Sequence, residues 1–257
     1  MILLLAIAFL GYANADVQYS DSLARNVMFP LSAAAYSDQP QQCLSRLFPK
    51  SKLQRQVTVK CDKGGSEQNK TGLCSGFTAV LHKHKAIALS FRGTVASVQL
   101  FQEINKTVFL KLASWFYGGK ISKYFSDAFS NIWFAGMGDD YLFLRERFPK
   151  YEVWITGHSL GGALASLAAS FLVGSRMAMP NKVKLVTFGQ PRTGDSNFSD
   201  AFNSQAFYKE DMSNYTICNE GEDVECSDGL WFPASFDAHT HYFGHHVSQY
   251  GKSGCAN

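Results

Sequence analysis

The pattern of apolar residues changes its period within one stretch near the middle of the chain. Residues 153–156 are β-branched or aromatic, which is typical of a short buried strand. From Leu164 onward the apolar residues fall at helical spacing. They are Leu164, Leu167, Ala168, Phe171 and Leu172. The pattern therefore predicts a strand, a sharp turn and then a helix.

The turn between these two elements reads GHSLG and places Ser159 between Gly157 and Gly161. Glycine removes the Cβ atoms that would collide where the chain reverses. A G-x-S-x-G turn between a strand and a helix is a nucleophile elbow, which lifts the serine Oγ above a sheet beside a helix N-terminus. The alternative is an ordinary turn rich in small residues. Because strand and helix flank the turn as catalysis requires, we interpret Ser159 as a nucleophile.

The same analysis predicts further helices and strands on both sides of the elbow. In chain order they are a helix at 23–37, a hairpin at 76–91 with its tip at 83–85, an amphipathic helix at 121–133, a helix at 141–148 that Pro149 stops, and a strand at 184–188. Strands that alternate with helices predict a mostly parallel sheet covered on both faces.

The N-terminal residues 1–15 form an apolar run that is too short to span a bilayer. The run ends in the small-residue pattern Ala13-Asn14-Ala15. This pattern predicts a secretory signal peptide that is cleaved before Asp16, and a core strand or membrane anchor is the alternative. No later run is apolar enough for a membrane span, so we expect a secreted, extracellular protein with one domain at 16–257.

The charge balance and the cysteines narrow the class further. A net charge of +3, with no basic cluster beyond HKHK at 82–85, argues against a nucleic-acid partner. Six cysteines suit an oxidising compartment, and no C-x-x-C pair supports the alternative of a zinc site. Local spacing favours the pairs Cys61–Cys74 and Cys218–Cys226, and leaves Cys43–Cys255 to tie the N-terminal helix to the C-terminus. Four sequons for glycosylation, at Asn69, Asn105, Asn197 and Asn214, agree with secretion.

Four segments carry a resemblance to a known family. They are FRGT at 91–94, TGHSLGGALA at 156–165, TFGQPRTGD at 187–195 and DAHTHYFG at 237–244. They occur in the order of the class 3 triacylglycerol lipases, and the chain resembles secreted nematode members closely and fungal lipases more distantly. The resemblance covers nearly all of the chain after residue 15. It implies an α/β-hydrolase fold with a lid segment, no cofactor, and hydrolysis of acylglycerol esters at a lipid–water interface through an acyl-enzyme.

The resemblance also implies roles for single residues. Ser159 matches the nucleophile, and Thr94 and Leu160 match the residues whose N–H groups form the oxyanion hole. The chain order of serine, acid and then histidine leaves His239, His241, His245 and His246 as candidate bases. The spacing alone does not choose among them, whereas the resemblance selects His239. A metal-binding or surface cluster is the alternative for these histidines, but no carboxylate or thiolate completes a convincing ligand set.

A candidate lid follows the oxyanion strand at residues 94–109. Its apolar residues include Phe101 and Ile104, and the family has an amphipathic lid at the matching place. An apolar lid face would cover the site in water and bind lipid once displaced. The alternative is an ordinary core helix.

The chain departs from the family where the third member of the triad is expected. The family runs a strand that ends in an Asp, but here the strand that starts at 206–209 passes directly into polar sequence, so the acid-bearing strand after Lys209 is truncated. Asp195 is better interpreted as a helix N-cap. Other carboxylates include Asp211, which lies nearest to the expected position, and Glu222, Asp223 and Glu225 in the Cys218–Cys226 loop, and none of these matches the motif. The alternative function is therefore an inactive lipase-fold protein that binds lipid or a protein partner.

Overall fold

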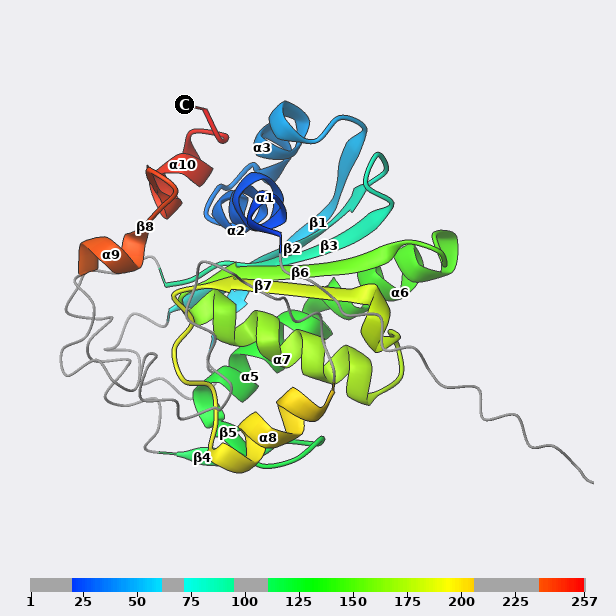
Figure 1. Ribbon diagram of the computed structural model, residues 1–257, viewed down its shortest axis with the longest axis vertical. Coiled ribbons are helices and arrows are strands. Elements are labelled where there is room, and N and C mark those ends of the chain that lie inside the picture. The colour runs from blue at the N-terminus through cyan, green and yellow to red at the C-terminus, as the bar shows by residue number, and fades with distance from the viewer. Residues whose placement is uncertain (1–19, 62–71, 95–110, 206–235, 257) are drawn as a thin grey trace, which may run out of the picture.

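The computed structural model describes residues 20–61, 72–94, 111–205 and 236–256. Within these ranges a five-stranded sheet lies between two layers of helices (Figure 1). Several predictions lie outside the described residues: the signal peptide, the lid after Thr94, the region of the missing acid, Cys218 and Cys226, and the sequons at Asn69, Asn105 and Asn214.

The strands of the sheet lie in the order β1-β2-β3-β6-β7. Their bounds are β1 Ser51–Lys60, β2 Leu73–Leu81, β3 Ala86–Phe91, β6 Glu152–His158 and β7 Val183–Phe188. β3, β6 and β7 are parallel, and β2 is antiparallel to both of its neighbours. Four of the five strands therefore run in one direction, as predicted. β2 is the exception because a short hairpin turn can join only antiparallel strands.

Two groups of helices cover the two faces of the sheet (Figure 1). On one face lie α1 Asp21–Leu23, a π-helical turn at Ala24–Met28, α2 Phe29–Ala34, α3 Pro40–Leu47 and α10 Val247–Lys252. On the other face lie α5 Lys123–Ile132, a π-helical turn at Trp133–Met137, α6 Gly138–Arg147 and α7 Leu160–Gly174. The smaller elements are the hairpin of β4 Leu112–Ser114 and β5 Lys120–Ser122, a 3-10 turn at Pro180–Lys182, α8 Ser196–Ser204, α9 Phe236–Thr240, and the hairpin of β8 His241–Tyr242 and β9 His245–His246.

The alternation of side chains along β3 creates two hydrophobic cores. Ala86 and Ala88 belong to the core under α2 and α3, whereas Ile87 and Leu89 belong to the core under α5 and α7. All four side chains are fully buried. Ser90 faces α2, where its hydroxyl donates to the carbonyl oxygen of Leu31 at 2.8 Å, so this buried polar group is paired.

The structure corrects the start of one predicted helix and adds an edge strand to the central sheet. Ile121 belongs to β5, where it pairs with Ala113, and the helix begins only at Lys123. Ile121 is buried in the strand just as it would be in a helix, so the apolar period does not distinguish the two. The hydrophobic pattern also does not predict β1, because most of its residues are half-buried or exposed at the edge of the sheet.

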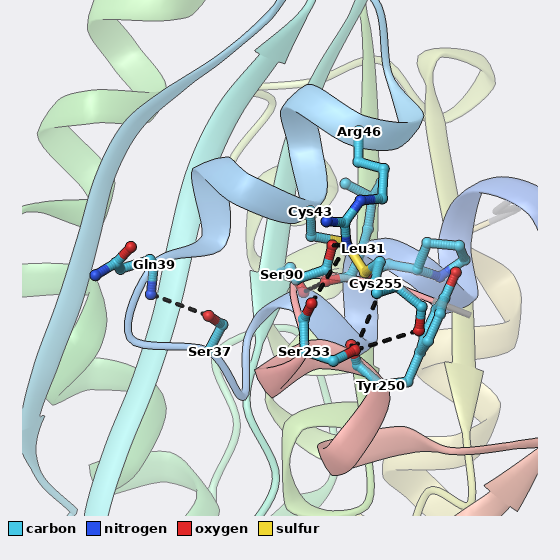
Figure 2. Close-up of a disulfide and its surroundings, with 12 residues drawn as sticks. Leu31, Ser37, Gln39, Cys43, Arg46, Ser90, Tyr250, Ser253 and Cys255 are labelled. Atoms are coloured by element: carbon cyan, nitrogen blue, oxygen red, sulfur yellow. Dashed lines mark hydrogen bonds between the residues drawn. A yellow bond between two sulfur atoms is a disulfide. The ribbon is translucent and has the colours of Figure 1, made fainter.

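Two disulfides lie within the described residues. Cys61 and Cys74 connect the residues after β1 to β2, with their Cα atoms 5.0 Å apart. Cys43 and Cys255 lie with their Cα atoms 4.9 Å apart, so the predicted bond to the C-terminal region starts on α3 and not on the first helix (Figure 2). Arg46 lies beside this disulfide and donates to the carbonyl oxygens of Ser253 and Gly254. These contacts hold α10 against the N-terminal helices.

Candidate active site

Ser159 occupies the turn between β6 and α7 in a backbone conformation that serine rarely adopts. Its φ is 57° and its ψ is −128°. Its N–H donates to the carbonyl oxygen of Phe188 at 2.9 Å, which ties the turn to the end of β7. A positive φ at a non-glycine residue is strained and persists only where the surrounding structure imposes it. The elbow predicted from the sequence is therefore present as a strained strand–turn–helix.

The glycines on both sides of Ser159 are required by close backbone contacts. A Cβ atom on Gly157 would collide with the carbonyl group of Gly161. A Cβ atom on Gly161 would collide with the carbonyl group of Phe91 at the end of β3. Neither neighbour is a flexible side chain, so neither can move aside. The two glycines bring β3, β6 and α7 together at one point.

The loop after β3 lies directly against this elbow. A Cβ atom on Gly93 would lie 3.1 Å from the Cβ of Ser159 and 2.5 Å from the carbonyl oxygen of His158. Thr94 follows in the same loop and is half-buried. Leu160 is the first residue of α7, and the N–H groups in the first turn of a helix have no partner within the helix. The predicted oxyanion residues thus come from two segments that both adjoin Ser159.

His239 lies on α9 and approaches the elbow from the far end of the chain. Its imidazole ring lies 4.8 Å from the ring of His158, centroid to centroid. A Cβ atom on Gly189, just after β7, would lie 2.9 Å from the Nδ1 of His239. Burial lowers the pKa of His239, which favours the neutral imidazole that a general base requires. The candidate nucleophile therefore lies at the carboxyl end of β6, and the candidate base on α9 lies against the residue that follows β7.

The other candidate histidines have local partners. His241 pairs with Asp237 at 2.9 Å and its ring lies 4.9 Å from that of His246. His245 stacks on Tyr250 with 4.3 Å between the ring centroids. Among the described residues, no group of three or more His, Cys, Asp or Glu side chains could hold a metal ion.

Asp195 is the helix N-cap that the sequence predicts. Its carboxylate accepts hydrogen bonds from the N–H of Phe198 in α8 and from the N–H of Lys120, both at 2.9 Å. These bonds join α8 to the β4–β5 hairpin and account for the position of this carboxylate. The remaining acidic candidates, Asp211, Glu222, Asp223 and Glu225, lie outside the described residues.

The structure adds two residues that the sequence patterns did not single out for the site. Tyr36, which follows α2, forms a hydrogen bond with the Nδ1 of His158 at 2.6 Å. Tyr242 lies close to the same histidine, with 5.7 Å between the ring centroids. Tyr36 falls within an apolar run that predicts a helix, and Tyr242 within the motif that contains His239, so no local signal marks either one.

The fold and the strained serine define the class of the protein. A mainly parallel sheet with helices on both faces and a serine at the strand–helix elbow is the arrangement of the α/β-hydrolases. The family model "Lipase (class 3)" matches residues 88–224, which is more than half of the chain. The chain belongs to the class 3 lipase family.

Individual relatives agree with this assignment. Lipase ZK262.3 of Caenorhabditis elegans is 37% identical over 197 residues, which is 75% of this chain and 52% of that protein. The chain thus spans about half the length of this curated relative. The structure of Rhizomucor miehei triacylglyceride lipase superposes with a TM-score of 0.69 at 19% identity, covering 90% of this chain and 97% of that one. Lipase II from Rhizopus niveus gives a TM-score of 0.68 at 20% identity and covers 93% and 99%.

Proposed function

We propose that this protein is a secreted serine esterase of the lipase type, which hydrolyses acylglycerol esters through an acyl-enzyme. The observation that carries the proposal is the strained Ser159, whose Cβ lies beside the loop of Thr94 and whose neighbour His158 lies against His239. Strain of this kind is retained where function requires a fixed geometry. The names of the relatives, which are lipases, support ester substrates.

The proposed reaction has two stages that use the same residues. His239 takes the proton of the Ser159 hydroxyl as Oγ attacks the ester carbonyl, and the N–H groups of Thr94 and Leu160 stabilise the oxyanion. His239 then protonates the leaving alcohol, and an acyl group stays on Ser159. Water then attacks this acyl-enzyme with His239 again as base, and His239 passes that proton to the Oγ of Ser159 as the bond to the acyl carbon breaks and the fatty acid leaves. Residues 94–109, with Phe101 and Ile104, are proposed as the lid that binds the lipid surface.

A second function is favoured by the sequence between residues 206 and 235. This region lacks the family's strand-ending Asp, and a histidine without its acid is less well oriented and less basic. In serine hydrolases, replacing the carboxylate of the triad lowers kcat by about 10⁴-fold. We therefore propose weak hydrolysis, with an inactive protein that binds lipid or a protein partner as the alternative.

The test compares the purified chain with its Ser159→Ala variant on p-nitrophenyl butyrate and on an emulsified triglyceride. Ser175→Ala is the control, because Ser175 lies at the other end of α7 and donates to the carbonyl oxygen of Phe171. We expect slow turnover that Ser159→Ala abolishes and Ser175→Ala retains. Turnover that does not depend on Ser159 would refute the esterase proposal. Activity at the level of an intact lipase would show that another carboxylate completes the triad, and Asp211 would be the first candidate.

A further inference from the structure

His158, the residue between Gly157 and Ser159, has hydrogen bonds on both ring nitrogens. Its Nε2 lies 2.7 Å from the backbone carbonyl oxygen of His239. Its Nδ1 lies 2.6 Å from the hydroxyl oxygen of Tyr36. The side chain is buried, with 3% of its surface exposed. The mechanism above assigns no role to this histidine, although it links the nucleophile turn to the segment that carries the base.

The partners of His158 determine where its proton lies. A carbonyl oxygen can only accept, so Nε2 must carry the hydrogen and donate it to His239. In a neutral ring Nδ1 then accepts, and the Tyr36 hydroxyl donates to it. Burial lowers the pKa of His158 to about 3, so the ring is neutral at ordinary pH. The direction of every hydrogen bond in the chain from Tyr36 to His239 is thereby fixed.

The Tyr36 hydroxyl also contacts the loop that carries the candidate oxyanion residue. A Cβ atom on Gly93 would collide with this hydroxyl oxygen, so the Gly93 backbone and the oxygen are in direct contact. Burial raises the pKa of Tyr36 and outweighs the opposing effects of Arg92 and of the backbone hydrogen bond from Gly93. Tyr36 therefore stays protonated, and it donates to His158 while it accepts from Gly93.

Tyr36 itself is held by the turn that follows α2. Its N–H donates to the carbonyl oxygen of Ala33 at 2.9 Å. In the same turn the hydroxyl of Ser37 accepts from the N–H of Gln39 at 3.0 Å (Figure 2). The Tyr36 side chain is 4% exposed. The hydrogen-bond chain thus starts from a fixed element on one face of the sheet.

We propose that Tyr36 and His158 form a positioning relay that sets His239 and the Thr94 loop relative to Ser159. This inference rests on the proposed esterase function. Both are positioning residues, because they act through the backbone of His239 and of Gly93 and their roles require no contact with substrate. A displacement of about 1 Å at a reacting group lowers the rate by as much as ~100-fold, so loss of the relay should lower kcat more than it changes KM.

The kinetic test uses Tyr36→Phe, His158→Gln and His158→Leu on a soluble ester. Gln retains an N–H that can reach the carbonyl of His239, whereas Leu retains only volume. We expect kcat to fall about 10-fold in Tyr36→Phe and more in His158→Leu, with partial recovery in His158→Gln and KM within about twofold. Tyr141→Phe is the matched control, because Tyr141 is a buried tyrosine whose hydroxyl donates to Met177 at 3.0 Å and lies outside the proposed site. It should lower stability and leave kcat unchanged.

A second measurement decides the relay even if the parent chain has no activity that depends on Ser159. Hydrogen–deuterium exchange should rise in α9 in Tyr36→Phe and His158→Leu, and stay at the parental rate there in Tyr141→Phe. If exchange rises without any turnover in the parent, the esterase proposal fails and the structural relay stands. If exchange in α9 is unchanged, or if kcat stays within twofold while only thermal stability falls, the relay is refuted.

Discussion

The buried, neutral His158 should make the free energy of unfolding fall at acid pH, and His158→Gln should remove this dependence on pH. His158 has an ordinary pKa of 6.5 in the unfolded chain and a pKa of about 3 in the folded protein, because burial penalises the charged ring. Below pH 6.5 the His158 ring binds a proton in the unfolded state but stays neutral in the folded state. The free energy of unfolding therefore falls as the pH falls, and the stability that is present above pH 6.5 is progressively lost toward pH 3.

The size of this effect follows from the two pKa values. One pKa unit corresponds to about 1.4 kcal/mol, so this one histidine should remove about 2.5 kcal/mol of stability between pH 7.5 and 4.5. This loss of stability is nearly the same for any folded-state pKa below about 4, because the His158 ring of the folded protein then stays largely neutral over this pH range. His239 and His246 are charged neighbours when protonated and act in the same direction, since each lowers the pKa of His158 further.

The assay is urea unfolding, followed by near-ultraviolet circular dichroism at pH 7.5, 6.0 and 4.5 with the disulfides intact. Other titrating groups contribute nearly equally to the parent and to His158→Gln, so the difference between their pH profiles isolates His158. The parent should lose about 2.5 kcal/mol more than His158→Gln over this range. His241→Gln removes a more exposed histidine that pairs with Asp237 and serves as the matched control. Parallel profiles for the parent and His158→Gln would refute the buried neutral ring.

Three further predictions concern stability, each measured by urea unfolding. Removing the Cys43–Cys255 disulfide, which closes a separation of 212 residues, should lower the free energy of unfolding by roughly 5 kcal/mol. Removing Cys61–Cys74, with its separation of 13, should lower it by roughly 3 kcal/mol. Equal losses would contradict the explanation by loop entropy. Gly161→Ala should destabilise by at least about 2 kcal/mol, because the new Cβ meets the Phe91 carbonyl, whereas Gly72→Ala, whose nearest atoms lie at 3.8 Å, should be tolerated. Asp195→Ala should cost about 1 kcal/mol at pH 7 through loss of the α8 cap. Hydrogen bonds to the carboxylate, the largest effect coming from the N–H of Lys120, lower the pKa of Asp195. The stability cost of Asp195→Ala should therefore shrink as the carboxylate becomes protonated in acid. A stability cost that does not change with pH would contradict this role of the ionised cap.

The sequence predicts those parts of the fold where a local pattern matches the final environment. The strand before Ser159 and the helix after it are both recognised because β6 and α7 are buried almost throughout, so their apolar periods are complete. Asp195 is recognised as a cap because its partner, Phe198, lies only three residues away. β1 is not recognised, because an edge strand half exposed to water needs no apolar run.

The relay could not be predicted, because its members are far apart in the chain. Tyr36 and His158 are separated by 122 residues, and His158 and His239 by 81. Each looks ordinary in its own segment: a tyrosine after an apolar helix and a variable position inside a turn motif. The resemblance to class 3 lipases selects Ser159 and His239 as nucleophile and base, which stays a prediction, but only the folded chain shows what lies between them.

The Cys43–Cys255 disulfide also has a consequence for biosynthesis. Cys43 leaves the ribosome about two hundred residues before its partner, so it must stay unpaired, or be released from a wrong pairing, while β1 to β7 are made. This late bond and Arg46 secure the end of α10 (Figure 2), and His239 lies on α9, which comes shortly before α10 in the chain. We expect the nascent chain to complete its sheet first and to acquire its candidate base last. Closure of this disulfide would then be a late step that fixes the position of the segment carrying the candidate base.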